Sequence, residues 1–185
     1  MNFDEILADN PIIAAVTDFE ELNRAINSDT QVIFVLFGDI LSVKKISNII
    51  NDNNKIGIVH IDLIEGLNQK EAAVRYLKQE TKFKGIISTK FQTIKIAREE
   101  GLIAILRSFV FDTLSLNKAK GHLLSEIDAI EILPGIIPKV IKELSMTSNK
   151  PIICGGLIKT KEEVMEALNS GASSVSTTKK EIWNM

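Results

Sequence analysis

Two short apolar segments near the end of the chain each finish in small residues whose chemistry suits an anion. The first runs into Gly155 and Gly156, and the second into Ser176, Thr177 and Thr178. Glycine lets backbone amides approach an oxyanion without a Cβ in the way, and hydroxyl groups add further donors. The pattern predicts a binding site for a ligand phosphate. The alternative is an ordinary turn followed by an ordinary helix cap.

Charged side chains are predicted at the ends of four further apolar segments. They are Asp62, Lys90, Arg107 and Glu131. A carboxylate that faces a buried interior is costly unless it is paired or bound to a ligand. We therefore expect the two carboxylates to hold ligand hydroxyl groups, and the two cations to pair with them or with ligand charge. The alternative is a ring of ion pairs that serves stability alone.

Other chemical sites have weaker support in the sequence. His60 with Asp62 and Glu65 could form a metal site, but the only other histidine, His122, falls in a helix-like segment. Cys154, the single cysteine, is more often a buried apolar side chain than a nucleophile. No P-loop, dinucleotide fingerprint or Ser/His/Asp order is present. We therefore expect no catalytic residue, no metal and no cofactor.

These residues need a scaffold that brings the ends of many apolar segments to one place. Eight short apolar runs are present, as expected for parallel strands covered on both faces. The predicted strands are residues 12–16, 32–37, 56–62, 85–89, 102–107, 129–133, 151–154 and 173–177. Helices are predicted before, between and after them, among them 3–9, 69–82, 161–170 and 179–183. The last of these would aim its first amides at the predicted phosphate site.

Eight strands with crossover helices can form either an open doubly wound sheet or a closed barrel. An open sheet gathers functional residues at one switch point, whereas polar residues here end nearly every strand, as in a barrel. We therefore predict a single-domain (β/α)8 TIM barrel of the phosphate-binding type over residues 1–185, whose phosphate site follows strands seven and eight. Helix 69–82 is expected to pack through Ala72, Ala73, Leu77 and the stem of Tyr76. Helix 161–170 is expected to pack through Val164, Ala167 and Leu168.

The composition predicts a soluble cytoplasmic protein. Hydrophobic residues make up 45% of the 185 residues and aromatic residues only 5%, and the formal net charge is −2. The acidic start of the chain differs from the basic start of a signal peptide, and no apolar run reaches the length that a membrane span needs.

Positive charge is concentrated in residues 68–98, which carry eight basic and two acidic side chains. Arg75, Lys78 and Lys82 are spaced to form one stripe on a helix, and Lys95 and Arg98 do the same on the next helix. Two adjacent basic stripes could follow an RNA backbone. The alternative is a solvated helix face, since this segment lacks the exposed aromatic residues that grip unstacked bases.

An ordered set of motifs then resembles the glycerol-3-phosphate-responsive antiterminator family over almost the whole chain. The motifs are LFGDI at 36–40, HIDLIEG at 60–66, GIISTK at 85–90, AIEILPG at 129–135, PIICGGLI at 151–158 and VSTT at 175–178. Any one of them alone is loose, whereas the set in this order is specific. The family pattern often has a polar residue where this chain has Leu106, and a basic one where it has Thr17.

The resemblance implies a TIM barrel that senses glycerol 3-phosphate, binds the leader mRNA of glycerol-utilisation genes and prevents transcription termination there. Gly155, Gly156, Ser176 and Thr177 match the phosphate-loop motifs of the family. Asp62, Lys90, Arg107 and Glu131 match its polar mouth. Two other functions stay open: an enzyme that acts on a small phosphorylated metabolite, and a phosphate-binding scaffold for a protein partner. The oligomeric state stays open as well.

Overall fold

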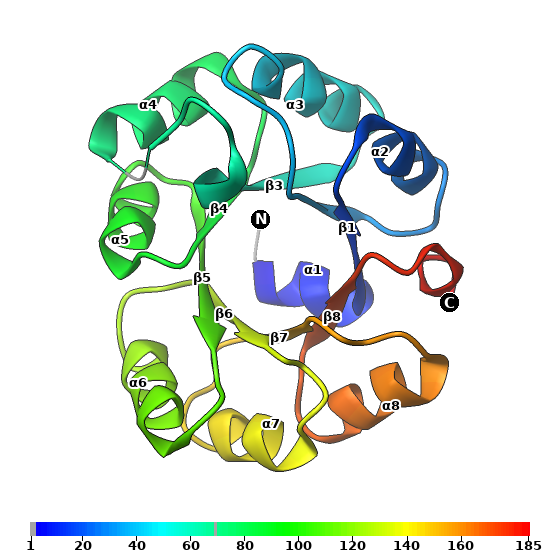
Figure 1. Ribbon diagram of the computed structural model, residues 1–185, viewed down its shortest axis with the longest axis vertical. Coiled ribbons are helices and arrows are strands. Elements are labelled where there is room, and N and C mark those ends of the chain that lie inside the picture. The colour runs from blue at the N-terminus through cyan, green and yellow to red at the C-terminus, as the bar shows by residue number, and fades with distance from the viewer. Residues whose placement is uncertain (1–2, 69) are drawn as a thin grey trace.

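The computed structural model describes residues 3–68 and 70–185, which form one closed barrel of eight parallel strands (Figure 1). Each strand pairs with its neighbours in chain order, and β1 pairs with β8 to close the barrel. The strands are β1 (Ile12–Val16), β2 (Val32–Val35), β3 (Ile56–His60), β4 (Gly85–Ser88), β5 (Ile103–Phe109), β6 (Ala129–Leu133), β7 (Ile152–Gly155) and β8 (Ser174–Thr177). The predicted TIM-barrel fold is confirmed.

Helices cross from each strand to the next and form the outer ring of Figure 1. They are α2 (Phe19–Ile26), α3 (Val43–Asp52), α4 (Glu71–Glu80), α5 (Phe91–Glu99), α6 (Thr113–Leu123), α7 (Pro138–Ser145) and α8 (Lys161–Asn169). Gln69, at the start of the predicted helix 69–82, lies outside the described residues. None of the described helices is long and apolar enough to cross a membrane.

The N-terminal helix α1 (Phe3–Asp9) closes one end of the barrel. Its residues Phe3 and Leu7 are buried in the cluster of strand side chains that fills the barrel interior, together with Phe34 and Ile105. Because the chain runs from α1 directly into the start of β1, the closed end is the N-terminal end of the strands. Figure 1 shows α1 lying across the barrel axis. The carboxyl ends of the strands therefore provide the open mouth.

Two predictions about individual elements were wrong. The predicted strand 56–62 ends at His60, because a turn of 3-10 helix, η1 (Ile61–Leu63), follows at once. The predicted inward face of α4 included Ala72, which is exposed, whereas Val74 is buried beside Ala73 and Leu77. A valine loses more apolar surface to the core than an alanine, so the helix is rotated toward Val74.

Candidate ligand site at the barrel mouth

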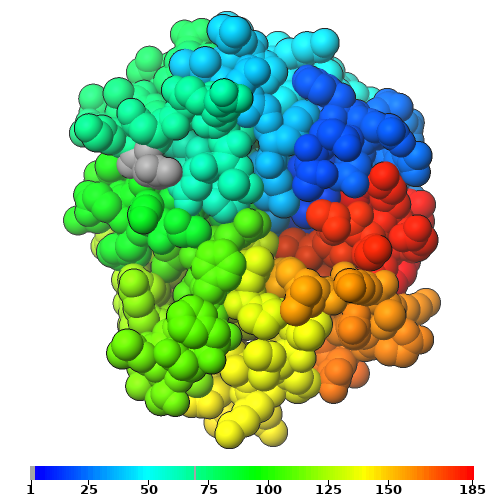
Figure 2. Space-filling model, in the orientation of Figure 1, coloured from blue at the N-terminus to red at the C-terminus, as the bar shows by residue number. Residues whose placement is uncertain are grey.

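A small cavity of about 150 Å³ lies where β7 and β8 end. It is lined by backbone and side chains from both loops and by one cation from β5, and its polar lining residues are Arg107, Gly156, Ser176, Thr177 and Thr178. Figure 2 shows the face that carries the mouth, where the last two units, in orange and red, meet the yellow and green ones. Four of the five residues predicted to bind phosphate therefore line one cavity, which we call the phosphate cavity after that prediction.

The loop after β7 turns sharply through two left-handed residues, Gly156 with φ +72° and Leu157 with φ +63°. A positive φ is easy for glycine and costly for a leucine, so the leucine is held there by its surroundings. Among the described residues, the N–H groups of Leu157 and Thr178 meet no acceptor of the protein, whereas that of Gly156 continues the β7–β8 ladder toward the Ser176 carbonyl. Two free amides beside one small cavity can receive the oxygens of an anion.

Gly155, the fifth predicted phosphate residue, lies below the cavity rather than in its lining. A Cβ at this position would approach Glu131 Oε1 and Ser176 Oγ to 2.7 Å each. The absence of a side chain at Gly155 therefore makes room for the contact between those two residues, and its carbonyl accepts a hydrogen bond from the N–H of Gly135.

The predicted helix 179–183 is only a single 3-10 turn, η2 (Lys180–Ile182). The N–H of Lys179 donates to Thr177 Oγ1 across 3.1 Å, and the indole N–H of Trp183 donates to the Thr177 carbonyl across 2.9 Å. The Thr177 hydroxyl itself donates to the carbonyl of Ile158 at 3.0 Å. The expectation that this segment aims free helix amides at the site was wrong, because its turn is short and tied to Thr177.

A buried ion pair joins β5 and β6 near their carboxyl ends. Arg107 Nε donates to Glu131 Oε2 across 2.6 Å, and the side chains are 11% and 1% exposed. The other carboxylate oxygen of Glu131 accepts a hydrogen bond from Ser176 Oγ, also at 2.6 Å. The register of the barrel brings this pair together, since Arg107 and Glu131 are direct partners in the β5–β6 ladder. Glu131 thus connects the phosphate cavity to the cation beside it.

Asp62 lies at the mouth on η1 and ties β3 to β4. Its carboxylate accepts three hydrogen bonds: from Ser88 Oγ at 2.6 Å, and from the N–H and Oγ1 of Thr89 at 2.8 Å each. Burial raises the pKa of Asp62, but these three donors outweigh burial and hold the pKa below its usual value. The carboxylate is therefore ionised, and most of its acceptor capacity is already used by the protein.

Lys90, the other predicted mouth cation, caps the start of α5 with its backbone and has an exposed side chain. Its N–H donates to Ser88 Oγ at 3.0 Å. In the part of the chain that the structure describes, its ammonium group forms no ion pair. Lys90 and Asp62 do not line the phosphate cavity.

His60 also lies at the mouth, beside the residues predicted to hold the ligand. It ends β3, is 2% exposed, and its Nδ1 has no hydrogen-bond partner among the described residues. Burial and the positive charge of Arg107 lower its pKa to about 4, against an opposing effect of Asp62. The imidazole is therefore neutral near pH 7. In the sequence, the signal for this residue is a histidine that ends a run of apolar residues.

The described residues are not arranged to form the metal site or the cysteine nucleophile that the sequence left as alternatives. No group of three or more His, Cys, Asp or Glu side chains is placed to hold a metal ion among these residues. Cys154 is fully buried, and burial raises the pKa of its thiol to about 12. A thiol with that pKa is almost entirely protonated at neutral pH and a poor nucleophile.

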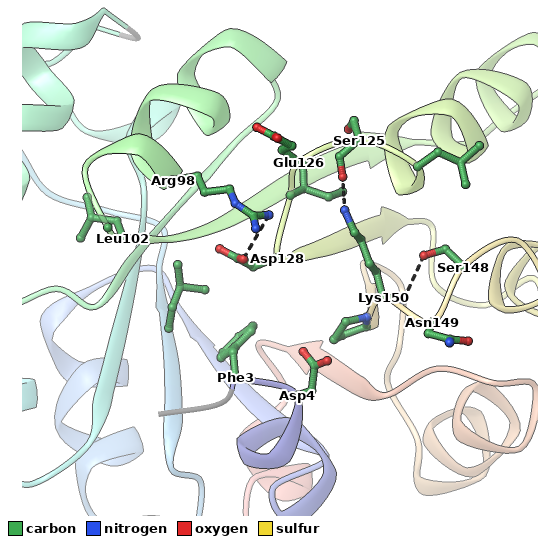
Figure 3. Close-up of a pocket in the computed structure, with 15 residues that line it drawn as sticks. Phe3, Asp4, Arg98, Leu102, Ser125, Glu126, Asp128, Ser148, Asn149 and Lys150 are labelled. Carbon is green, nitrogen blue, oxygen red and sulfur yellow. Dashed lines mark hydrogen bonds and ion pairs between the residues drawn. The ribbon is translucent and has the colours of Figure 1, made fainter.

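Four residues of the predicted RNA-binding stripes lie on α4 and α5, which are neighbours in the ring. The prediction was wrong for Lys82, because α4 ends at Glu80 and Lys82 lies in the loop that follows, where its backbone N–H donates to Ser47 Oγ. Arg75 forms ion pairs with Glu71 at 2.7 Å and Glu100 at 2.8 Å. Arg98 is 3.5 Å from Asp128 and lines a cavity of about 860 Å³ beside α1, at the closed end of the barrel (Figure 3). The side chains of Lys78, Lys82 and Lys95 are exposed. The stripe thus contains both paired and exposed cations.

The chain matches the family described as glycerol-3-phosphate responsive antiterminator over residues 12–183. It is 40% identical to the uncharacterized protein YgcP of Escherichia coli (strain K12) over 181 residues, which cover 97% of this chain and 95% of that protein.

Two solved structures agree with this match. The glycerol uptake operon antiterminator regulatory protein of Listeria monocytogenes is 31% identical with a TM-score of 0.88, over 93% of this chain and 94% of that one. A glycerol uptake operon antiterminator-related protein of Thermotoga maritima is 30% identical with a TM-score of 0.85, over 95% of this chain and 99% of that one. The chain belongs to the glycerol-3-phosphate responsive antiterminator family.

Proposed function

We propose that the protein senses glycerol 3-phosphate, binds the leader mRNA of glycerol-utilisation genes and prevents transcription termination there. The observation that carries this proposal is the cavity at the ends of β7 and β8. Its two unpartnered amides, its hydroxyl groups and the guanidinium of Arg107 match a phosphate dianion, and about 150 Å³ suits a three-carbon phosphate better than a large ligand.

The glycerol end of the ligand would extend from this cavity over the centre of the mouth. Arg107, Glu131 and His60 lie there, and the neutral imidazole has a free Nδ1 that can accept a hydrogen bond from a hydroxyl group. Asp62 and Lys90 lie farther round the mouth on η1 and at the start of α5, where they could contact the same end of the ligand.

RNA binding is the second half of the proposal, and the basic helices α4 and α5 support it. Exposed lysines are available there for phosphate contacts, whereas Arg75 and Arg98 would have to exchange a carboxylate for a phosphate. Because the target is a nascent transcript, we place the activity in the cytoplasm.

One observation favours a second candidate, an enzyme that acts on a small phosphorylated metabolite. His60 is a buried imidazole with a free nitrogen at the mouth, where a TIM-barrel enzyme would have its proton-transfer group. A base with a pKa of about 4 has little driving force for abstracting a proton near pH 7, so the regulator is the better proposal.

A titration separates the two functions. The purified protein is titrated into labelled leader transcripts of the organism's glycerol-utilisation genes, with and without glycerol 3-phosphate. We expect binding to at least one leader, with an affinity that the ligand changes. Absence of binding to every leader in both conditions would exclude the regulator. Consumption of glycerol 3-phosphate or a related sugar phosphate under the same conditions would favour the enzyme.

A further inference from the structure

A second cavity, of about 770 Å³, lies beside the phosphate cavity on the outer side of the mouth, between α5 and α6. Its lining is dominated by aromatic rings from three elements. Phe109 at the end of β5 is 52% exposed and Phe111 in the following loop is 79% exposed. Phe91 at the start of α5 stacks on His122 of α6, with ring centroids 5.0 Å apart and planes 26° apart. We call this cavity the aromatic groove.

The exposed rings are carried by a backbone that is fixed. The N–H of Val110, between the two phenylalanines, donates to the carbonyl of Leu133 at 2.8 Å. Ser115 Oγ accepts hydrogen bonds from the N–H groups of Phe111 and Asp112, both at 3.0 Å, and the Asp112 carboxylate caps α6 in return. A large apolar ring held rigidly in water is a costly arrangement unless something binds it.

The surroundings of the groove are positively charged. The α6 helix carries Lys118 and Lys120 and no acidic residue, with Lys120 paired to Glu143 of α7, and the middle of α5 contributes Lys95. Lys118 lines the groove directly. The one lining carboxylate, Asp112, is already used as the cap of α6. Aromatic faces bordered by lysines are complementary to a partner that is flat, apolar and anionic.

We propose that the aromatic groove holds unpaired bases of an RNA, stacked on Phe109, Phe111 and the Phe91–His122 pair. This inference rests on the proposed function and names the part of the protein that reads single-stranded RNA. The basic face of α4 and α5 lacks exposed aromatic rings, and the groove supplies them beside α5. The backbone of one RNA can therefore run along the lysines while its bases enter the groove.

The groove and the phosphate cavity share one wall, the side chain of Arg107. Arg107 is held by Glu131, and Glu131 accepts the hydroxyl of Ser176 from the phosphate cavity. A ligand phosphate that takes hydrogen bonds from Ser176 or Arg107 must change the contacts of Glu131, and so the position of the wall of the groove. Through this route the ligand and the RNA bias each other's binding by the same factor.

The test uses the leader transcript that the wild-type protein binds, with Phe111→Ala, Phe111→Trp and the control Phe19→Ala. Phe19 is also an exposed phenylalanine, 45% exposed, but it lies on α2 across the barrel from α6 (Figure 1). Loss of a stacking ring should weaken RNA binding between about 5-fold and 150-fold. Phe111→Trp should retain binding, and Phe19→Ala should bind as the wild type does.

Phe111→Trp also gives a direct optical readout, because the one natural tryptophan, Trp183, is buried. The fluorescence of the indole introduced at position 111 should be quenched when RNA is added, and not when glycerol 3-phosphate alone is added. If Phe111→Ala binds the leader transcript with the affinity of the wild type, the inference is overturned and the proposed function still stands. Failure of the wild type to bind any leader would overturn both. A wild-type dimer that Phe111→Ala converts to monomers would overturn the inference in favour of a self-association surface.

Discussion

Glu131 Oε2 lies 2.6 Å from Arg107 Nε in the mouth of the barrel, and the same carboxylate accepts the Ser176 hydroxyl. Because the glutamate is 1% exposed and the arginine 11%, neither charge is well solvated. Each depends on the other, and on hydrogen bonds, for its stabilisation. This pair stands between the phosphate cavity and the aromatic groove, so its substitution bears on both stability and binding.

The first prediction concerns the stability of this pair. Glu131→Gln leaves the guanidinium without its counter-charge, and we expect the free energy of unfolding to fall by about 3 kcal/mol or more. The control is Glu71→Gln, which breaks an exposed ion pair with Arg75 whose side chains are 55% and 54% exposed and should cost less than about 1 kcal/mol. Urea denaturation of both variants measures the difference. An equal decrease in the free energy of unfolding for both variants would show that the buried pair stabilises the protein no more than a surface pair does.

The second prediction concerns the role of Arg107 in ligand binding. Arg107→Ala alone would leave a buried carboxylate unpaired, so the informative variant is Arg107→Met/Glu131→Gln, which removes both charges. We expect its affinity for glycerol 3-phosphate to fall by about 1–3 kcal/mol, the usual effect of losing a charged hydrogen-bond donor. Isothermal calorimetry measures the affinity. A folded double variant with wild-type affinity would assign Arg107 to stability alone.

The third prediction separates backbone strain from the loss of a site. Gly156 and Gly101 both have φ +72°, so an alanine at either position carries a similar backbone cost. A Cβ at Gly156 would approach Leu133 Cδ2 to 3.2 Å at the edge of the phosphate cavity, whereas one at Gly101 meets only Lys78 Nζ at 3.8 Å. Gly156→Ala should therefore weaken phosphate binding at least about tenfold, or 1.4 kcal/mol, and Gly101→Ala should not. If both variants bind glycerol 3-phosphate as the wild type does, the β7 loop is not the anion site.

The fourth prediction follows from the pKa of His60, which is lowered to about 4 in the folded state. The unfolded chain binds this proton below about pH 6.5, so stability is lost as the pH falls from that value toward 4. Between pH 7 and pH 5 the loss should be about 2 kcal/mol.

His60→Gln removes this titration, so its denaturation midpoint should change less between the two pH values than that of the wild type. The pKa of His122, the other histidine, is also lowered, by burial and by Lys118. His122→Gln is therefore the matched control, and it should retain most of the pH dependence. An unchanged pH dependence in His60→Gln would show that the imidazole is not kept neutral by its surroundings.

The sequence was sufficient for the barrel and for most of the phosphate cavity. Eight apolar runs can bury both faces only between layers of helices, and Gly156 and Ser176 end strands that must be neighbours in such a barrel. Arg107 and Glu131 lie on adjacent strands, so their ion pair was one of the expected arrangements.

The positions of Asp62 and of the exposed phenylalanines depend on where β3 and β5 end, which the sequence did not predict. Asp62 was predicted to end a strand, but a 3-10 turn follows β3 and carries this residue instead. The sequence around Phe109 and Phe111 carries no sign that these rings would stay in water, because β5 continues two residues beyond the predicted strand and then turns at a side-chain cap. Both outcomes are decided by tertiary contacts between segments far apart in the chain.

The last prediction concerns the basic stripes, whose members now differ in their surroundings. Lys78 and Lys95 are exposed, whereas Arg75 and Arg98 are paired with carboxylates. If RNA follows α4 and α5, the lysines can neutralise phosphates at no electrostatic cost, and the arginines must first leave their partners.

We therefore compare Lys78→Ala/Lys95→Ala with Arg75→Ala/Arg98→Ala in a salt titration of leader RNA binding. The lysine variant should lower the slope of log K against log salt by between about 1.4 and 1.8, from roughly 0.7 to 0.9 per phosphate contact, and the arginine variant should lower it less. Affinity for glycerol 3-phosphate should be unchanged in both, because all four positions lie on the outer helices and away from the phosphate cavity. A wild-type slope in the lysine variant would remove α4 and α5 from the RNA path and leave the backbone contacts to the lysines of α6, which border the aromatic groove on its other side.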